Sequence, residues 1–360
     1  MFAALLAFVS TNTLFPAAIA ARLDRDIAAV VRSHNLPSVA LEVDVPKRGR
    51  YMFVDGYANL TTKTPRTLAQ PFRIASITKP YAATAILVLV DRGLLEKSDT
   101  VSKWYPDFPY ASRITIDDLL RMRSGIPAPS DDEVLAQVYD APLAPAPPLS
   151  DELASYARRK NKFVAPNTIG EYANFNYDIL SGIVHKVTGK DIGQLITETV
   201  IQPLRLNATS YPTGTGISGP LRGYGWNPKT KRFDDKTAFN PPLAGAAGAV
   251  IADIPDLIAF SRALCVGGLL KPATQSERLQ GQPLQGAHTD YGEGVAVGSG
   301  ACGHSGTING FSTDMYYVAA SDASFVVSVN RLDRDNQSQT TPILALIGQA
   351  VKDLPRRQAP

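Results

Sequence analysis

The pattern of hydrophobic and polar positions predicts strands near both ends of the chain and helices between them. Residues 39–45 alternate between apolar and polar positions, and residues 50–56 form a second such run after a turn, so we expect two paired strands. Near the other end, short runs rich in β-branched and aromatic residues indicate further strands of an antiparallel sheet. These runs cover residues 294–297, 300–305, 312–318 and 324–330.

Apolar residues that recur every three or four positions predict the helices. The predicted helices span residues 21–33, 76–95, 115–123, 151–160, 177–188, 191–201, 254–264 and 342–354. Thr115 is expected to cap its helix, because Asp118 follows three residues later. Residues 214–235, which are rich in glycine, proline and aromatic residues, are expected to be irregular.

The simplest architecture for this order of elements is an α/β (α+β) fold with two lobes. Residues 21–80 and 240–356 would form an antiparallel sheet flanked by the N- and C-terminal helices, and residues 81–239 an inserted, mainly helical lobe. Residues 128–150 within that lobe are rich in proline and alanine, so we expect an extended, polyproline-like loop. Long loops often act as lids or binding loops, and the sequence leaves open whether this one does.

The first residues have features of a secretory signal. Residues 1–9 are apolar but too few to cross a bilayer, and Ala18, Ile19 and Ala20 resemble a cleavage site. We therefore predict a signal segment over residues 1–20 and a secreted or periplasmic protein without an integral membrane span. The basic region that usually begins such a signal is missing, so a simple N-terminal helix is the alternative.

The composition excludes several classes of protein. The chain has 360 residues, of which 44% are hydrophobic and 19% charged, as in soluble globular proteins. The net charge is +3 without a basic block, which argues against a nucleic-acid partner. The four histidines are scattered without metal-ligand spacing, so no metal or cofactor is implied. Cys265 and Cys302 could form a disulfide or remain two buried thiols, and the oligomeric state is open.

Candidate chemistry lies at the start of the apolar helix near residue 76. Ser76 and Lys79 are three residues apart, which places a hydroxyl and an amine on one face of a helix. If the amine is desolvated, its pKa falls and it can accept the hydroxyl proton. A serine with its own base is an activated nucleophile. Alone, this spacing is weak evidence, because a lysine in a first helical turn is usually a solvated surface residue.

Two later motifs strengthen the hypothesis that Ser76 and Lys79 are catalytic. Tyr172-Ala173-Asn174 lies in the middle of the chain, and Gly303-His304-Ser305-Gly306-Thr307 lies in a predicted strand. Ser-x-x-Lys, Tyr-x-Asn and [Lys/His]-x-Gly in this order resemble the motifs of the serine β-lactamase and penicillin-binding-protein superfamily. The tyrosine in the second motif is similar to class C β-lactamases and to the related D,D-carboxypeptidases, D-aminopeptidases and esterases. The resemblance runs from about Leu23 to Asn330. Further stretches that resemble the family lie at residues 114–120, 123–127, 203–209 and 244–253.

The resemblance implies the β-lactamase/transpeptidase-like fold and a role for each motif residue. Ser76 would attack an acyl carbonyl and become acylated, and Lys79 would help to deprotonate it. Tyr172 would share the role of base, as a phenolate held by the lysine cation, and would pass the proton to the leaving group. Asn174 would hydrogen-bond the substrate amide and Lys79. The strand residues His304, Ser305, Gly306 and Thr307 would bind substrate, with the backbone N–H groups of Ser76 and Thr307 as oxyanion hole.

The third motif departs from the usual Lys-Thr-Gly of these families. His304 replaces a permanent cation by an imidazole that is mostly neutral at pH 7. No lysine or arginine occurs between Arg278 and Arg331. These features argue against efficient hydrolysis of β-lactams. Related proteins that bind the carboxylate of a β-lactam usually keep a cation on or near this strand. A D,D-carboxypeptidase remains open if Arg121 or Arg123 supplies that cation.

Three functions remain in competition. The leading hypothesis is a serine hydrolase that forms an acyl-enzyme at Ser76 and cleaves amides in peptides that contain D-residues, as a D,D-carboxypeptidase or D-aminopeptidase would. The second is an esterase or acyltransferase that forms the same acyl-enzyme. The presence of Asn174 slightly favours amide substrates over this alternative. The third is a β-lactamase or a penicillin-binding sensor that is never deacylated. The substrate would be a small molecule or a peptide.

Overall fold

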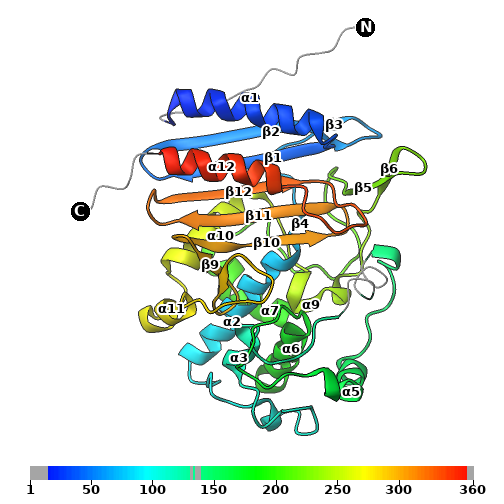
Figure 1. Ribbon diagram of the computed structural model, residues 1–360, viewed down its shortest axis with the longest axis vertical. Coiled ribbons are helices and arrows are strands. Elements are labelled where there is room, and N and C mark those ends of the chain that lie inside the picture. Colours follow the sequence, from blue (N-terminus) through cyan, green and yellow to red (C-terminus); the bar gives the residue numbers. More distant parts are fainter. Residues whose placement is uncertain (1–14, 130–132, 134–138, 355–360) are drawn as a thin grey trace.

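In the computed structural model, the described residues are 15–129, 133 and 139–354 (Figure 1). Most of the predicted signal segment and residues 130–132 and 134–138 of the proline-rich segment lie outside them. The helices are α1 Ala17–Ser33, α2 Thr78–Asp91, α3 Ile116–Leu120, α5 Leu149–Arg158, α6 Phe175–Thr188, α7 Ile192–Ile196, α8 Gln202–Leu204, α9 Gly245–Gly248, α10 Ile254–Val266, α11 Pro272–Arg278 and α12 Thr341–Asp353.

An antiparallel sheet organises the molecule and, within the described residues, has eight strands in the order β3-β2-β1-β12-β11-β10-β9-β8. Its strands are β1 Ser38–Val45, β2 Gly49–Asn59, β3 Thr64–Pro65, β8 Asp290–Tyr291, β9 Ala296–Gly298, β10 Ala301–Ile308, β11 Phe311–Val318 and β12 Ala323–Val329. The N-terminal hairpin joins the C-terminal strands where β1 pairs with β12, with Val39 opposite Val329. The predicted antiparallel sheet is therefore confirmed.

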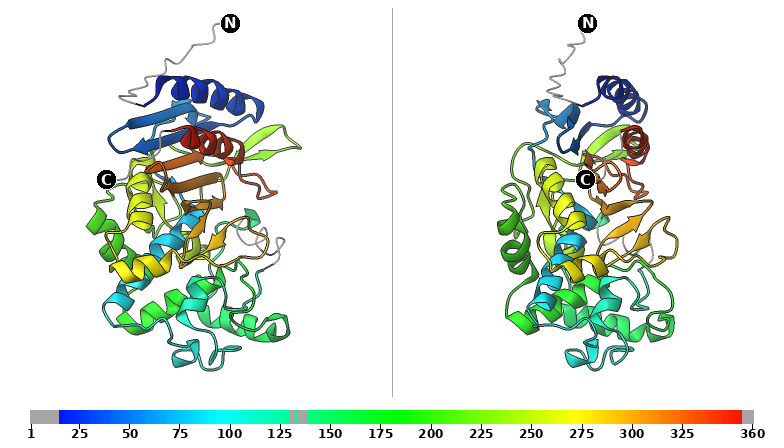
Figure 2. Two further views of the ribbon diagram at one scale, coloured as in Figure 1. Left: turned by 60° about the vertical axis from the view of Figure 1, so that its left-hand side comes forward. Right: turned by 90° about the vertical axis from the view of Figure 1, so that its left-hand side faces the viewer.

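Helices cover both faces of the sheet, which explains why its central strands β1, β11 and β12 are buried at nearly every position, polar residues included. Alternate residues of β1, such as Val39 and Leu41, pack with α1 and α12, whereas Ala40 between them packs with the core on the other side. Figure 2 shows α1 and α12 next to each other on one face and α10 on the opposite face. A strand buried on both faces shows a continuous apolar run.

The middle of the chain supplies the helices at the far end of the molecule, where α2, α3, α6 and α7 lie together (Figure 1). Helix α2 is buried from Thr78 to Leu89, as its largely apolar sequence predicts. Two small sheets accompany this part: β4 Phe72–Arg73 pairs with β7 Ile251–Ala252, and β5 Tyr224–Asn227 pairs with β6 Arg232–Asp235. None of the described helices combines the length and the apolar character that a bilayer crossing requires.

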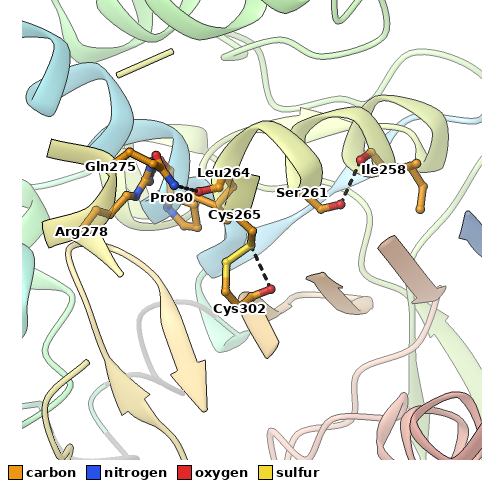
Figure 3. The surroundings of a disulfide bond; sticks show 8 residues. All are labelled: Pro80, Ile258, Ser261, Leu264, Cys265, Gln275, Arg278 and Cys302. Atoms are coloured by element: carbon orange, nitrogen blue, oxygen red, sulfur yellow. Dashed lines mark hydrogen bonds between the residues drawn. A yellow bond between two sulfur atoms is a disulfide. The ribbon is translucent and has the colours of Figure 1, made fainter. Parts of the chain in front are cut away.

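A disulfide joins Cys265, at the end of α10, to Cys302 in β10 (Figure 3). It therefore fixes the helix that covers one face of the sheet to the strand that carries the third motif. Nearby, the buried Arg278 of α11 donates a hydrogen bond of 3.0 Å to the carbonyl of Pro80 in α2. This hydrogen bond fixes the beginning of α2 to α11.

Several boundaries differ from the prediction. The helix expected from residue 76 is preceded by a 3₁₀ turn, η1 Ala75–Ile77, and ends at Asp91. The helix at Thr115 has the predicted capping box but stops at Leu120, because Met122 adopts a positive φ of 59°. The helix expected over residues 191–201 becomes π-helical at η5 Thr197–Ile201.

Two segments differ in type as well as in length. Residues 214–235 are not wholly irregular, because they contain the β5–β6 hairpin. The candidate cleavage site at Ala18–Ala20 lies inside α1, where Ala20 is buried against the sheet.

Candidate active site

The candidate nucleophile lies in a tight turn that leads from β4 into α2. Ala75 has a φ of 51°, an uncommon value for a residue with a side chain, and Ser76 follows it in η1. Two hydrogen bonds fix the turn: Ile74 N donates to Val250 O over 3.1 Å, and Val250 N donates to the Thr78 hydroxyl over 3.0 Å. The surrounding segments therefore hold the Ser76 side chain at the wall of a hollow instead of in a regular helical turn.

Lys79 lies directly beside this serine. Its side chain is fully buried, and Nζ donates hydrogen bonds to Ser76 Oγ over 2.9 Å and to the carbonyl of Ala247 over 3.0 Å. Burial lowers the pKa of Lys79 to about 7, against the opposing effect of Asp178. A large part of the population is thus neutral near pH 7, which is the form that can accept a proton.

Tyr172 completes the group around the amine. The Lys79 Nζ atom lies 4.7 Å from the centre of the Tyr172 ring. Burial raises the pKa of Tyr172, and the nearby Ser76 hydroxyl lowers it by less. The hydroxyl is shielded from water, and its geometry towards the other described residues is too poor for a regular hydrogen bond. The phenolate expected from the sequence is therefore not favoured, and Tyr172 is a neutral hydroxyl beside a partly neutral amine.

Ser76 and Tyr172 face a common hollow of about 300 Å³, as the sequence predicts. Its wall also includes Asn174 and Asp178 from the start of α6, and Thr307 from β10. Lys79 forms part of the support behind Ser76 rather than of the wall. The hollow therefore lies where the helical part of the chain meets the edge of the sheet.

The strand β10 approaches the serine turn so closely that only glycine fits at one position. A Cβ atom on Gly306 would lie 2.3 Å from Ile74 O and 3.1 Å from Ser76 N. Strand β9 pairs with β10 only as far as Gly303, so within the described sheet the edge from residue 304 to residue 308 has no strand on that side. This close approach brings the backbone of Thr307 to the hollow, as an oxyanion hole requires.

His304 is part of the support for this site and not of its wall. Its Nδ1 lies 2.6 Å from Ser305 O, so Nδ1 is the protonated nitrogen, and Nε2 accepts a hydrogen bond of 3.0 Å from the Tyr291 hydroxyl. Burial, and then the charge of Lys79, lower the pKa of His304 to about 3. The imidazole is neutral and already bonded at both nitrogens. Ser305 is exposed and interacts with Tyr316 of β11.

The arginines that could have supplied a cation are used elsewhere. Arg121 is buried, forms an ion pair with Asp117 at 2.7 Å and donates to the carbonyl of Gln280 at 2.6 Å. Arg123 donates to the side chain of Asn167 over 3.0 Å. No lysine or arginine is among the described residues that line the hollow. Neither arginine is therefore placed to bind a substrate carboxylate in this hollow.

Asn174 lies at the hollow but is exposed, and its side chain makes no regular hydrogen bond to Lys79 in the described structure. The carbonyl of Ala247 takes the place that the sequence reasoning gave to this asparagine. The reasoning also missed Asp178 and Tyr291. Asp178 lies four residues after Asn174, about one helical turn, and a helix predicted to begin at Asn174 rather than at residue 177 would have placed both on one face. The acceptor at Ala247 is a backbone atom, which leaves no trace in the residue type.

Comparison with known proteins agrees with this architecture. The chain matches the Beta-lactamase family over residues 23–349 and therefore belongs to that family. It is 27% identical over 284 residues to "Penicillin-binding protein 4*" of Bacillus subtilis, a match that covers 72% of this chain and 60% of that protein. The chain thus spans less than two thirds of the length of this curated relative.

Among solved structures, the D-amino acid amidase from Ochrobactrum anthropi SV3 is similar, with a TM-score of 0.78 and 25% identity, covering 94% of this chain and 98% of that chain. A D-stereospecific amidohydrolase from Streptomyces sp. has a TM-score of 0.74 and 26% identity, covering 88% and 94% of the two chains. The β-lactamase/transpeptidase-like fold expected from the sequence is confirmed.

Proposed function

We propose that the protein is a serine hydrolase that forms an acyl-enzyme at Ser76 and acts on amide bonds of D-amino-acid-containing amides or peptides. The observation that carries this proposal is the 2.9 Å hydrogen bond between Lys79 Nζ and Ser76 Oγ, made by an amine whose pKa burial lowers to about 7. A base of this kind is matched to proton transfer near neutral pH.

In the proposed reaction, neutral Lys79 takes the proton of Ser76 while the serine oxygen attacks the substrate carbonyl. The developing negative charge on the carbonyl oxygen is stabilised by the backbone N–H groups of Ser76 and Thr307. The tetrahedral intermediate then collapses: the C–N bond breaks, and the leaving nitrogen receives a proton through the neutral Tyr172 hydroxyl. A water molecule then attacks the acyl-enzyme through the same steps, which releases the carboxylic acid and restores the Ser76 hydroxyl.

The preference for D-residues rests on two structural relatives that are named as D-amino acid amidase and D-stereospecific amidohydrolase. The lack of a lysine or arginine among the described lining residues supports amidase chemistry over recognition of a carboxylate-bearing β-lactam or D-Ala-D-Ala terminus. An esterase or acyltransferase is the second candidate.

We also propose a secreted or periplasmic location. The disulfide between Cys265 and Cys302 supports it, since such bonds persist mainly in oxidising compartments.

Two measurements test the proposed function. A fluorophosphonate probe should add to wild-type protein at Ser76, as seen by intact-mass spectrometry and peptide mapping, and should leave Ser76→Ala unmodified. A panel of D-amino-acid amides, D-Ala-D-Ala peptides, a chromogenic cephalosporin and p-nitrophenyl esters should give the highest kcat/KM for the D-amides. The highest value for the esters would select the second candidate, and no adduct at any pH would refute both.

A further inference from the structure

Asp178 places a carboxyl group at the hollow that contains Ser76. It lies on α6, one helical turn after Asn174, and both residues line that hollow. Its Oδ1 atom faces α9, because a methyl group at Gly245 would lie 3.1 Å from it. Ala247, the carbonyl partner of Lys79, lies two residues further along α9. The carboxyl group is therefore close to the catalytic amine, on the side where a substrate would lie.

A second hollow of about 310 Å³ continues from the first and shares Asn174 and Asp178 with it. Glu152 of α5 lines this second hollow and lies near enough to Asp178 to raise its pKa by charge repulsion. Arg159 is the cation in this wall, and it forms an ion pair with Glu133 at 2.5 Å. The path from Ser76 into the second hollow thus carries an excess of acidic groups.

Neither Asp178 nor Glu152 has a hydrogen-bonding or ion-pair partner for its side chain among the described residues. Burial raises the pKa of Asp178 to about 8, with Glu152 adding to the rise and Lys79 opposing it. Burial raises the pKa of Glu152 to about 7. Two neighbouring carboxyl groups that are poorly solvated and form no ion pair are unfavourable when ionised, and a cation bound between them would reduce that cost.

A second polar side chain at the first hollow also lacks a hydrogen-bond partner. Asn309, in the turn after β10, is only 1% exposed, and neither polar atom of its amide has a hydrogen bond within the described structure. Buried polar groups are nearly always hydrogen-bonded, so an unpaired amide at the wall of a hollow indicates a group that arrives with a ligand. This observation is independent of the acidic residues and indicates a polar ligand in the same hollow.

We propose that Asp178, with Glu152 behind it, forms a subsite for the ammonium group of the substrate. The preferred substrates are then amides of amino acids or peptides with a free amine, and not N-acylated or carboxylate-terminated peptides. The inference rests on the proposed function, because it places the ammonium group relative to a scissile carbonyl at Ser76. A bound ammonium group lowers the pKa of a nearby carboxyl group, so the subsite is occupied in its ionised form.

The test compares D-phenylalanine p-nitroanilide with its N-acetyl derivative, which differs in the charge of the amine. Wild-type kcat/KM should favour the free amine at least ~10-fold, and Asp178→Asn should reduce this ratio about 10-fold or more, mainly through KM. Glu152→Gln should reduce it less. Asp107→Asn removes an exposed acid that lines neither hollow and should leave the ratio unchanged. Asp178 also influences the pKa of Lys79, so its replacement can lower activity on both substrates. The ratio of the two kcat/KM values is therefore compared, because a loss common to both substrates cancels in it.

A binding measurement separates this inference from the proposed hydrolysis. Calorimetric titration of Ser76→Ala should show tighter binding of D-phenylalaninamide than of N-acetyl-D-phenylalaninamide, and the added replacement Asp178→Asn should abolish the difference. Equal binding of the two ligands, or an equal effect of Asp178→Asn on both, overturns the subsite. Preferential amine binding that depends on Asp178, in a protein whose Ser76 takes no fluorophosphonate, supports the subsite and refutes the proposed hydrolysis.

Discussion

Two buried bases lie within the same core, Lys79 at the serine turn and His304 on strand β10, and burial lowers the pKa of both. They differ in their partners. Lys79 donates to a hydroxyl that can give up its proton, whereas His304 is bonded at both nitrogens to Ser305 O and the Tyr291 hydroxyl. Desolvation alone therefore does not make a base reactive. The partner must be a group that the reaction changes.

The largest expected effect comes from the nucleophile itself. Ser76→Ala should lower kcat/KM for the best D-amide by at least ~10³-fold, because it removes the hydroxyl that is hydrogen-bonded to Lys79 Nζ. Circular dichroism should show an unchanged fold, since Ser76 is only partly buried. Turnover close to that of wild type in the purified variant would remove Ser76 from the mechanism.

Lys79→Met keeps the length of the side chain and removes the base. Acylation should fall by ~10²–10⁴-fold, the usual contribution of a general base, in stopped-flow measurements with a p-nitroanilide. Lys103, an exposed lysine paired with Asp99 at 3.0 Å, provides the control, and Lys103→Met should behave as wild type. Equal rates for the two variants would show that the buried amine does not act on Ser76.

Tyr172→Phe should reduce acylation by ~10²-fold, because the proton then lacks its path to the leaving nitrogen. Tyr177 is the matched control: its ring is also near Lys79, at 5.9 Å, but its hydroxyl lies 3.4 Å from Leu120 O in the core. We expect Tyr177→Phe to change kcat/KM by less than ~10-fold. A loss of the same size in both variants would point to general packing around the amine.

His304→Gln should have the smallest effect on catalysis. We expect kcat/KM within ~10-fold of wild type and a loss of about 1–3 kcal/mol in the free energy of unfolding, because buried hydrogen bonds are disturbed. The pH profile should show no step from this imidazole between pH 5 and pH 8, since its pKa is lowered to about 3. A step that His304→Gln removes would mean that the imidazole titrates in the working enzyme.

Much of this arrangement could be predicted from the sequence, because the residue types carry it. Periodic apolar runs predicted the main sheet and the buried helix α2, and the three spaced motifs contain four residues that line the hollow: Ser76, Tyr172, Asn174 and Thr307. The exact start of α2 could not be predicted, since the turn at Ala75 depends on hydrogen bonds to Val250, far away in the chain. The saturated bonding of His304 depends on Tyr291, which belongs to no motif.

The pH dependence of Ser76 labelling tests the central claim most directly, because it reports on the base without a specific substrate. The second-order rate of fluorophosphonate addition should rise as pH increases and level off above an apparent pKa of about 7, as Lys79 becomes neutral. The step should disappear in Lys79→Met. A rate that keeps rising to about pH 10, the ordinary range of a solvated lysine, would contradict the account.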